Sequence, residues 1–299
     1  MSDVTPDWIA VDWGTSNVRA WAMSGSGVVL AEATSDKGMG ELTRDEFEPE
    51  LIRTIGDWLH GPITIVACGM VGSRQGWVEA PYAAVPCPPL PEGFARPKVE
   101  NADLQVHVIP GIKQADPADV MRGEETQIAG FLARNKNWDG VICLPGTHTK
   151  WVHVSADEVV SFQTFMTGEL FATISENTVL RHSIASDGWD DDAFSNAIEE
   201  AMARPERLAG RLFSLRAEGL LNDLSGSAAR ARLSGLLIGA ELAAAKPYWL
   251  GQQIAVIGAG GISKLYVDAL AAQHAPATQV QANAITLAGL TAAYQRLKG

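Results

Sequence analysis

Residues 12–19 are the first segment whose side chains could do chemistry, and they read Asp-Trp-Gly-Thr-Ser-Asn-Val-Arg. The backbone N–H groups of Gly14, Thr15 and Ser16, with the neighbouring hydroxyls, can form a nest of donors for phosphate oxygens. Asp12 can hold Mg²⁺ through its water shell, because this ion keeps several waters when it binds to proteins. An ordinary hairpin in which Asp12 caps its own turn explains the same residues. This segment alone leaves both interpretations open.

A second copy of the same pattern favours the phosphate interpretation. An apolar run at 8–11 precedes the first segment, and strand-like runs follow it at 18–23 and 28–31. The same order of strand, Gly-Thr hairpin, strand and strand returns between residues 140 and 162, with Gly146 and Thr147 in the hairpin. Two such hairpins that face each other could grip a polyphosphate from both sides. Leu144 stands where the first copy has Asp12.

A pair of acids, Glu124 and Glu125, opens a predicted helix over residues 121–131. Carboxylates at the start of a helix are stabilised by the helix dipole, so a structural role explains them completely. The helix directly precedes the second copy, however. We therefore expect its first turn to lie in a cleft between the two halves of the chain, where a carboxylate could act on a ligand.

Several cations and one further acid accompany these motifs. Singly, each cation is equally well explained as an exposed or ion-paired side chain, but as a group in an acidic protein they favour an anionic ligand. Arginine offers a carboxylate a planar two-pronged fit. The acid could hydrogen-bond hydroxyl groups of a ligand or stabilise a helix start. The residues are Arg74, Arg122, His148, Lys150 and Glu169.

A glycine-rich loop follows a predicted strand at 253–257 and precedes a predicted helix at 263–274. It contains Gly258, Gly260 and Gly261. As a dinucleotide-binding fingerprint it fails, because Ser263 stands where the third glycine belongs and no strand ending in an acid follows.

Composition narrows the class of protein. Hydrophobic residues make up 46% of the 299 residues and charged residues 19%, as in ordinary globular proteins. No apolar run approaches the roughly 20 residues that a membrane span needs, and the polar N-terminus predicts no secretory signal. Three widely spaced cysteines predict reduced thiols and a cytoplasmic protein. A net charge of −12 opposes a nucleic-acid-binding surface.

The remaining elements are predicted from periodicity and from glycine and proline signals. We expect a helix capped by Thr43 or Asp45 that ends near Leu59, an irregular proline-rich segment at 81–97, and a first domain that ends near Asp119. The remaining predicted strands are 63–68, 106–111 and 278–281, and the remaining predicted helices are 190–204, 206–221, 225–246 and 284–296.

Taken together, six strings resemble the 2-dehydro-3-deoxygalactonokinase family, within the superfamily of actin, Hsp70 and sugar kinases. They are DWGTSNVRAW, GMVGSRQGW, APY, MRGEETQ, LPGTHTKW and MTGEL. The resemblance implies an α/β protein with two actin-like (ribonuclease H-like) domains around a nucleotide cleft. Residues 1–119 would form the N-terminal domain and residues 120–299 the C-terminal one, with the last helix, 284–299, packing back at the hinge. The implied reaction is phosphorylation of the terminal (6-) hydroxyl of 2-dehydro-3-deoxy-D-galactonate by ATP with Mg²⁺, in galactonate catabolism.

The resemblance also implies roles for individual residues. Asp12 would position Mg²⁺, and Glu125 would accept the proton of the attacking hydroxyl, with Glu124 as its close rival. Because Leu144 replaces the acid that many superfamily members carry there, a base from the second hairpin is excluded. Phosphates would be held by Gly14, Thr15, Ser16, Gly146 and Thr147; adenosine by Gly258, Gly260 and Gly261; and the sugar acid by Arg74, Arg122, His148, Lys150 and Glu169.

Two other functions remain open at this stage. One is a phosphoanhydride hydrolase on the same scaffold, since the Gly-Glu-Glu string also resembles exopolyphosphatase. The other is a non-catalytic, sugar-responsive regulator, although the sequence offers no spare basic helix-turn-helix for DNA. The expected partners are ATP and a small sugar acid, without nucleic acid or membrane. The oligomeric state, a homodimer included, is left open.

Overall fold

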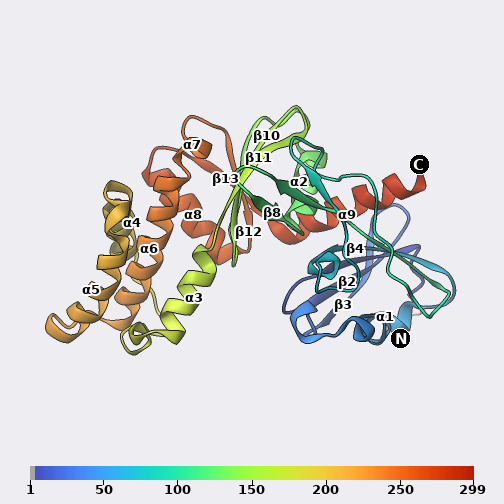
Figure 1. The fold of residues 1–299 in the computed structure, drawn as a ribbon, viewed down its shortest axis with the longest axis horizontal. Helices are drawn as coiled ribbons and strands as arrows, with labels where there is room; N and C mark the ends of the chain where they lie inside the picture. Colours follow the sequence, from blue (N-terminus) through green and yellow to red (C-terminus); the bar gives the residue numbers. More distant parts are fainter. Residues whose placement is uncertain (1–3) are drawn as a thin grey trace. The chain divides into compact units, whose positions relative to one another are not determined.

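The computed structural model describes residues 4–299 (Figure 1). The polar N-terminus, from which no secretory signal is expected, lies partly outside the described residues. The chain forms two compact units. The first comprises the residues up to Asp139 together with Val154–Ser161 and Ala282–Gly299, and the second comprises Gly140–His153 and Phe162–Gln281. The domain boundary expected near Asp119 therefore lies inside the first unit, and the C-terminal helix belongs to that unit as well.

The first unit is built on a five-stranded sheet in the order β3-β2-β1-β4-β6. Strands β1, β2 and β3 form an antiparallel meander, and β4 and β6 continue from β1 in parallel. Because parallel central strands are covered on both faces, β1 is apolar except at Asp12. The strands are β1 (Trp8–Trp13), β2 (Val18–Met23), β3 (Val29–Ser35), β4 (Ile63–Gly69) and β6 (Leu104–Val108).

Helix α1 (Phe47–Ile55) belongs to the core on one face of this sheet, where the rings of Trp13, Phe47 and Trp77 pack together. Helix α9 (Ala282–Lys298) contributes to the opposite core, and its Tyr294 ring stacks on Trp8 with 4.3 Å between centroids. Thr43 forms a capping box with Glu46, but on the 3₁₀ helix Arg44–Glu46 that leads into α1, and α1 itself ends at Ile55, before the expected Leu59.

Helix α2 (Glu124–Arg134) packs directly on α9. A Cβ atom on Gly289 would lie 1.9 Å from the carbonyl oxygen of Thr126, and one on Gly130 would lie 2.0 Å from that of Ile285. Two glycines thus bring the helix backbones into contact. This contact fixes the first turn of α2 in the first unit, and that turn carries Glu124 and Glu125.

A small sheet in the first unit was not expected. It consists of β5 (Tyr82–Ala84), β7 (Gly111–Gln114) and β8 (Asp119–Met121). The strand predicted at 106–111 is in fact the end of β6 and the start of β7, separated at Pro110, which has no N–H for a ladder. Apart from β5, the proline-rich segment is irregular, as expected.

The second five-stranded sheet belongs to the second unit except for residues 154–161 of β10, β11 and their connection, and it repeats the strand order of the first sheet, β11-β10-β9-β12-β13. Strand β12 runs parallel to both β9 and β13. The duplicated meander predicted from the sequence is therefore confirmed. The strands are β9 (Gly140–Leu144), β10 (Thr149–Ser155), β11 (Glu158–Phe165), β12 (Ile254–Gly258) and β13 (Ala277–Gln281).

Helices α4, α5 and α6 lie side by side in the second unit (Figure 1). Gly235 and Gly239 of α6 face α4, where Cβ atoms would lie 2.5 and 2.8 Å from the carbonyl oxygens of Phe194 and Ile198. Helix α3 was not predicted beyond the helix-start alternative for Glu169. The helices are α3 (Thr167–Asn177), α4 (Asp191–Ala203), α5 (Leu208–Leu221), α6 (Gly226–Ala244), α7 (Lys246–Trp249) and α8 (Gly260–Ala272).

Short 3₁₀ helices complete the chain at Met39–Glu41, Arg44–Glu46, Gly56–Trp58, Met70–Gly72, Val179–His182 and Pro205–Arg207. Among the described residues, no helix is both long enough and apolar enough to span a membrane.

Candidate functional site

The first Gly-Thr hairpin joins β1 to β2 and is closed by a hydrogen bond from Gly14 N to Asn17 O of 2.9 Å. Its carbonyl oxygens are occupied from one side, since Met39 N donates to Gly14 O and Gly40 N to Thr15 O, each at 2.9 Å. The side chains of Thr15 and the following Ser16 are exposed, and within residues 4–299 their N–H groups have no partner. The N–H groups of Thr15 and Ser16 are therefore available as hydrogen-bond donors, and their binding of phosphate stays a prediction.

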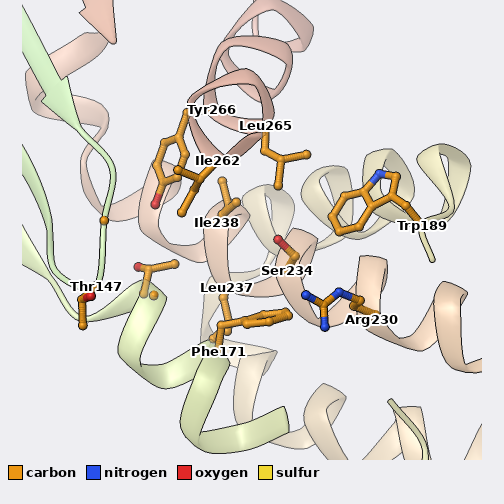
Figure 2. A pocket seen from close by; sticks show the side chains of 13 residues that line it. Thr147, Phe171, Trp189, Arg230, Ser234, Leu237, Ile238, Ile262, Leu265 and Tyr266 are labelled. Carbon is orange, nitrogen blue, oxygen red and sulfur yellow. The ribbon is translucent and has the colours of Figure 1, made fainter. Parts of the chain in front are cut away.

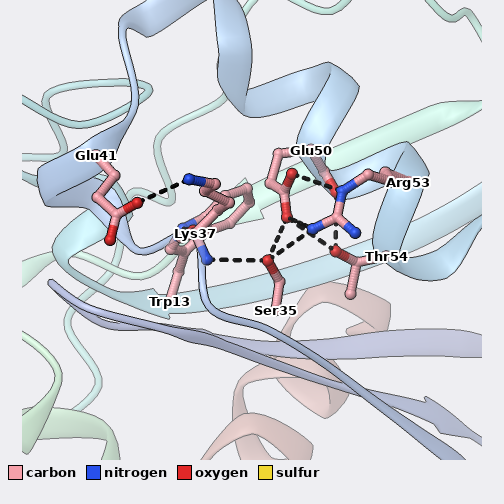
Figure 3. Close-up of polar contacts among 7 residues, drawn as sticks. All are labelled: Trp13, Ser35, Lys37, Glu41, Glu50, Arg53 and Thr54. Carbon is pink, nitrogen blue, oxygen red and sulfur yellow. Dashed lines mark hydrogen bonds and ion pairs between the residues drawn. The ribbon is translucent and has the colours of Figure 1, made fainter.

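A polar network holds the loop that supports this hairpin (Figure 3). The indole of Trp13 donates to the carbonyl oxygen of Lys37 at 3.3 Å, and Lys37 N donates to the Ser35 hydroxyl at 3.0 Å. Ser35 in turn donates to Glu50, which also binds Arg53 at 2.9 Å. The loop continues into Gly38, where a Cβ atom would lie 2.2 Å from Thr15 O. Only glycine permits this close support.

Asp12 lies at the end of β1, half-buried, and accepts a hydrogen bond from Arg19 Nη2 at 2.6 Å. Arg19 also binds Asn283 at the start of α9. The residues described contain no group of three or more His, Cys, Asp or Glu side chains that could enclose a metal ion. If Asp12 holds Mg²⁺, it does so as a single carboxylate, which this ion accepts because it keeps several of its waters. Sequence reasoning assigned Arg19 no role, although it ends the first motif.

Glu125 is fully buried in the first turn of α2. It accepts hydrogen bonds from Gly123 N at 2.6 Å and from the Thr126 hydroxyl at 3.0 Å. Gly123 has a φ of +107°, a conformation that glycine adopts readily, and this sharp turn lets the backbone N–H face the carboxylate. Burial, helped by the negative charge of Glu124, raises the pKa of Glu125 to about 7.

Asp12 and Glu125 both lie near Cys68, close to the ends of β1 and β4. Cys68 of β4 lies with its Sγ 3.8 Å from Asp12 Oδ1. Burial raises the pKa of this thiol, and the charges of Asp12 and Glu125 raise it further. The structure therefore brings the predicted metal-binding and proton-accepting carboxylates together within one unit.

Two arginines of this unit were expected to bind an anionic ligand. Arg122 is buried and Arg74 is exposed. Arg122 donates to Ala80 O at 2.8 Å and lies over the Tyr82 ring, 4.2 Å from its centroid, while its Nη1 has no hydrogen-bond partner. A Cβ on Gly72 would lie 2.9 Å from that Nη1. Arg122, which belongs to the MRGEETQ string, thus contacts residues of the APY and GMVGSRQGW strings. Arg74 pairs with Glu79 at 3.2 Å.

The second Gly-Thr hairpin, between β9 and β10, is held by the start of α3. Glu169 N donates to Thr147 O at 3.0 Å, and a Cβ on Gly168 would lie 2.3 Å from Gly146 O. The side chains of His148 and Glu169 approach each other at 2.5 Å. Two predicted substrate-binding residues therefore pair with one another beside the hairpin. The third predicted residue here, Lys150, is only 5% exposed.

A cavity of about 420 Å³ opens from the second hairpin (Figure 2). Thr147 lies at one end and Trp189 at the other, with apolar side chains of α6 and α8 between them. Gly260 and Gly261 form the first turn of α8, directly before the wall residue Ile262. The lining residues are Gly146, Thr147, Thr167, Gly168, Phe171, Trp189, Arg230, Ser234, Leu237, Ile238, Ile262, Leu265 and Tyr266.

Sequence reasoning missed the far end of this cavity. Trp189 and Arg230 come from segments without a recognisable motif, and Phe171 directly follows the MTGEL string without being part of it. The one sequence feature that could have indicated this end of the cavity is Trp189, a large aromatic residue next to Gly188 in a polar segment. Its side chain is 37% exposed. Arg230 lies over the Phe171 ring, 5.2 Å from its centroid. The cavity thus combines donors at one end with an apolar, partly aromatic remainder.

Comparisons with known proteins agree with one another. The family model described as 2-keto-3-deoxy-galactonokinase matches residues 12–293. A probable 2-dehydro-3-deoxygalactonokinase of Rhizobium meliloti (strain 1021) is 39% identical over 295 residues, which cover 96% of each chain. The 2-dehydro-3-deoxygalactonokinase of Escherichia coli (strain K12) is 33% identical over 96% of this chain and 97% of its own.

Solved structures extend the comparison. A crystal structure of a 2-dehydro-3-deoxygalactonokinase candidate from Sinorhizobium meliloti superimposes with a TM-score of 0.90 at 37% identity, covering 97% of this chain and 96% of its own. An activator of 2-hydroxyisocaproyl-CoA dehydratase from Clostridium difficile shares the fold at 9% identity, with a TM-score of 0.53 over 97% of this chain and 95% of its own. The expected α/β fold with two actin-like domains is confirmed.

Proposed function

This chain belongs to the 2-keto-3-deoxy-galactonokinase family and is a sugar-acid kinase, and we propose that its substrates are ATP and 2-dehydro-3-deoxy-D-galactonate. The γ-phosphoryl group passes to the terminal (6-) hydroxyl of the sugar acid. The observation that carries the proposal is the continuity of the Gly146–Thr147 hairpin with the apolar cavity in the second unit. The phosphates of a nucleotide need hydrogen-bond donors, and its adenine ring needs an apolar cavity. In the second unit the hairpin that can supply the donors adjoins the apolar cavity.

The nucleotide is assigned to the second unit. Adenine occupies the cavity between the apolar residues of α6 and α8. Gly258, Gly260 and Gly261 do not line this cavity, but they precede its wall residue Ile262, and we assign them to the nucleotide on that ground. The phosphates extend toward Gly146 and Thr147. Pockets that bind small molecules are mostly apolar and contain a few well-placed polar groups, which matches this lining.

The first unit supplies the other phosphate contacts. The unpaired N–H groups of Thr15 and Ser16, next to Gly14, bind phosphate oxygens, and Asp12 holds Mg²⁺ through water. When bound, this ion neutralises charge that develops on the transferred phosphoryl group. Arg19 keeps the Asp12 carboxylate oriented through the hydrogen bond between them.

The proposed base is Glu125, whose pKa of about 7 suits proton transfer near neutral pH. Its two hydrogen-bond donors belong to its own helix start, so lone pairs of the carboxylate remain for a substrate hydroxyl. Glu124, on the same turn and half-buried, is the rival base.

For the substrate carboxylate we favour Arg122 over Arg74. The described residues include no carboxylate that forms an ion pair with the Arg122 guanidinium, and its Nη1 has no partner, whereas Arg74 is paired with Glu79. Arg122 also lies just before the two acids in the chain. In the second unit, Lys150, His148 and Glu169 are assigned to the sugar acid's other polar groups, near the hairpin.

We place the enzyme in the cytoplasm because of its cysteines. Cys68, Cys87 and Cys143 are all free and buried, as reduced thiols in a reducing compartment would be.

The test of the function is an ADP-release assay over sugar acids and neutral sugars. We expect turnover with 2-keto-3-deoxy sugar acids and little with neutral hexoses. Efficient phosphorylation of neutral hexoses alone would contradict the assigned substrate. ADP formed in stoichiometric amounts without any acceptor would instead support the phosphoanhydride hydrolase.

A further inference from the structure

Glu241 of α6 is a buried carboxylate behind the nucleotide cavity, 3% exposed. It accepts hydrogen bonds from three side chains of different elements. Trp151 of β10 donates from Nε1 at 2.7 Å, Tyr266 of α8 donates its hydroxyl at 2.8 Å, and Thr167 of α3 donates its hydroxyl as well. All three donors are uncharged. Burial raises the pKa of Glu241 to about 7, against the effect of these bonds.

Burying a carboxylate that has no cation beside it lowers the stability of the fold, because the charge loses its hydration. An apolar side chain of similar volume avoids the desolvation of a charge, and burying charged groups often lowers stability overall. The three donors could likewise be replaced by apolar groups of the same shape with little loss. Packing alone therefore does not explain the network.

The network does explain how the second hairpin is held. Thr167 is the first residue of α3, and the next two residues of that helix contact the hairpin, Gly168 by close packing and Glu169 through its N–H to Thr147 O. On the other side of the hairpin, the Tyr266 hydroxyl lies 3.0 Å from Thr149 Oγ1 at the start of β10.

We propose that Glu241 is a positioning residue that fixes the Gly146–Thr147 hairpin and the Tyr266 wall for nucleotide binding. It does not line the cavity itself; it acts through Thr167 and Tyr266, which do. This inference rests on the proposed function, since it takes the cavity as the ATP site.

Two substitutions separate the role of the hydrogen bonds from that of the charge. In Glu241→Gln the hydroxyls of Thr167 and Tyr266 can turn and accept from the amide, and the amide oxygen can face the Trp151 indole, which only donates. In Glu241→Leu all three donors lose their acceptor. The predicted order of nucleotide affinity is wild type, then Gln, then Leu.

Calorimetric titration with ADP and steady-state kinetics provide the measurement. We expect Glu241→Leu to raise the Kd for ADP and the KM for ATP by about tenfold or more, the size of one lost charge-assisted hydrogen bond. The KM for the sugar acid should rise by less than that for ATP, because Glu169 follows Thr167 on the same turn of α3, and Gln should recover much of the affinity. A purely structural role would lower Tm and the active fraction and leave both KM values unchanged.

A matched pair of tryptophans controls for the loss of a buried indole bond. Trp151 donates to Glu241, whereas Trp249, buried in the same core cluster, donates to Leu242 O at 2.8 Å. Trp151→Phe should weaken ADP binding, and Trp249→Phe should not. This pair decides the question if Glu241→Leu fails to fold.

The outcomes separate the two proposals. If the wild type does not bind ADP, the proposed function fails together with this inference. If the wild type binds ADP and Glu241→Leu binds it with unchanged Kd, or Trp151→Phe does so where Glu241→Leu does not fold, only the positioning role is refuted.

Discussion

Replacing Glu125 by Gln tests the base and measures what its burial contributes to stability. The two side chains have the same shape, so the substitution removes a charge and leaves the packing in place. As the base, Glu125 must accept a proton, and a glutamine amide cannot. We expect kcat to fall by roughly 10²–10⁴, which is the usual contribution of a positioned base.

The same substitution should stabilise the protein at alkaline pH. The Glu125 pKa rises from its ordinary 4.5 to about 7, and each pKa unit corresponds to about 1.36 kcal/mol, so ionising the buried carboxyl destabilises the fold by roughly 3 kcal/mol. Because the folded pKa lies above the unfolded one, the group's contribution to stability is complete below pH 4.5 and is lost as the pH rises through 7.

Glutamine has no such dependence on pH. Its oxygen can accept from Gly123 N, and the Thr126 hydroxyl can turn to accept from the amide, so the exchange of hydrogen bonds costs about 1 kcal/mol. Glu125→Gln should therefore be more stable than the wild type by roughly 2 kcal/mol at pH 8 and lose this advantage near pH 5.

The assay is urea unfolding of both proteins at pH 5 and pH 8, beside ADP release at saturating substrates. A variant that is less stable than the wild type at pH 8, or that turns over at a near-normal rate, would refute this reasoning. Glu124→Gln is the matched control. Removing its charge should lower the Glu125 pKa, and so move the acidic limb of the kcat/KM profile to lower pH with turnover retained. If Glu124→Gln loses turnover instead, Glu124 is the base.

Three further substitutions address the other assignments. Asp12→Asn should raise the Mg²⁺ concentration needed for half-maximal activity and lower kcat; a variant that is only less stable in a melting experiment would support an ordinary hairpin. Gly168→Ala should raise the KM for ATP, because its Cβ meets Gly146 O at 2.3 Å, whereas Gly210→Ala, where a Cβ meets nothing within 4 Å, should leave the kinetics unchanged. Arg122→Lys should raise the KM for the sugar acid by about tenfold through the loss of a two-pronged contact, with Arg74→Ala near wild type in the same assay.

Much of the fold could be predicted because its signals are local. The strands on either side of each Gly-Thr hairpin are short apolar runs, and their duplication in the sequence reappears as the same strand order in both sheets. The cap at Thr43 could also be predicted, since it depends on a few neighbouring residues.

What could not be predicted depends on contacts between distant segments. The small sheet of β5, β7 and β8 consists of strands too short for a periodic signal, and β5 lies among prolines. Helix α8 begins at Gly260, not at Ser263, because Ser263 closes the first turn and does not precede it: its N–H and its hydroxyl both donate to Ala259 O, at 3.1 and 2.7 Å. The motif residues of each unit could be predicted, but Trp189 and Arg230 reach the cavity from segments that have no motif, and Phe171 lies one residue beyond the end of one.

Glu125 and Glu241 show why a raised pKa alone does not identify a catalytic group. Burial raises both pKa values to about 7, yet the two carboxylates differ in where their donors come from. The donors to Glu125 are its neighbours in the chain, so the bonds orient the group without tying it to other elements, and part of its lone-pair capacity is left for a substrate. The donors to Glu241 come from β10, α3 and α8, so its capacity is taken up in joining the elements around one hairpin. The first arrangement suits a group that exchanges a proton with a ligand, and the second suits a group that holds the ligand's site in place.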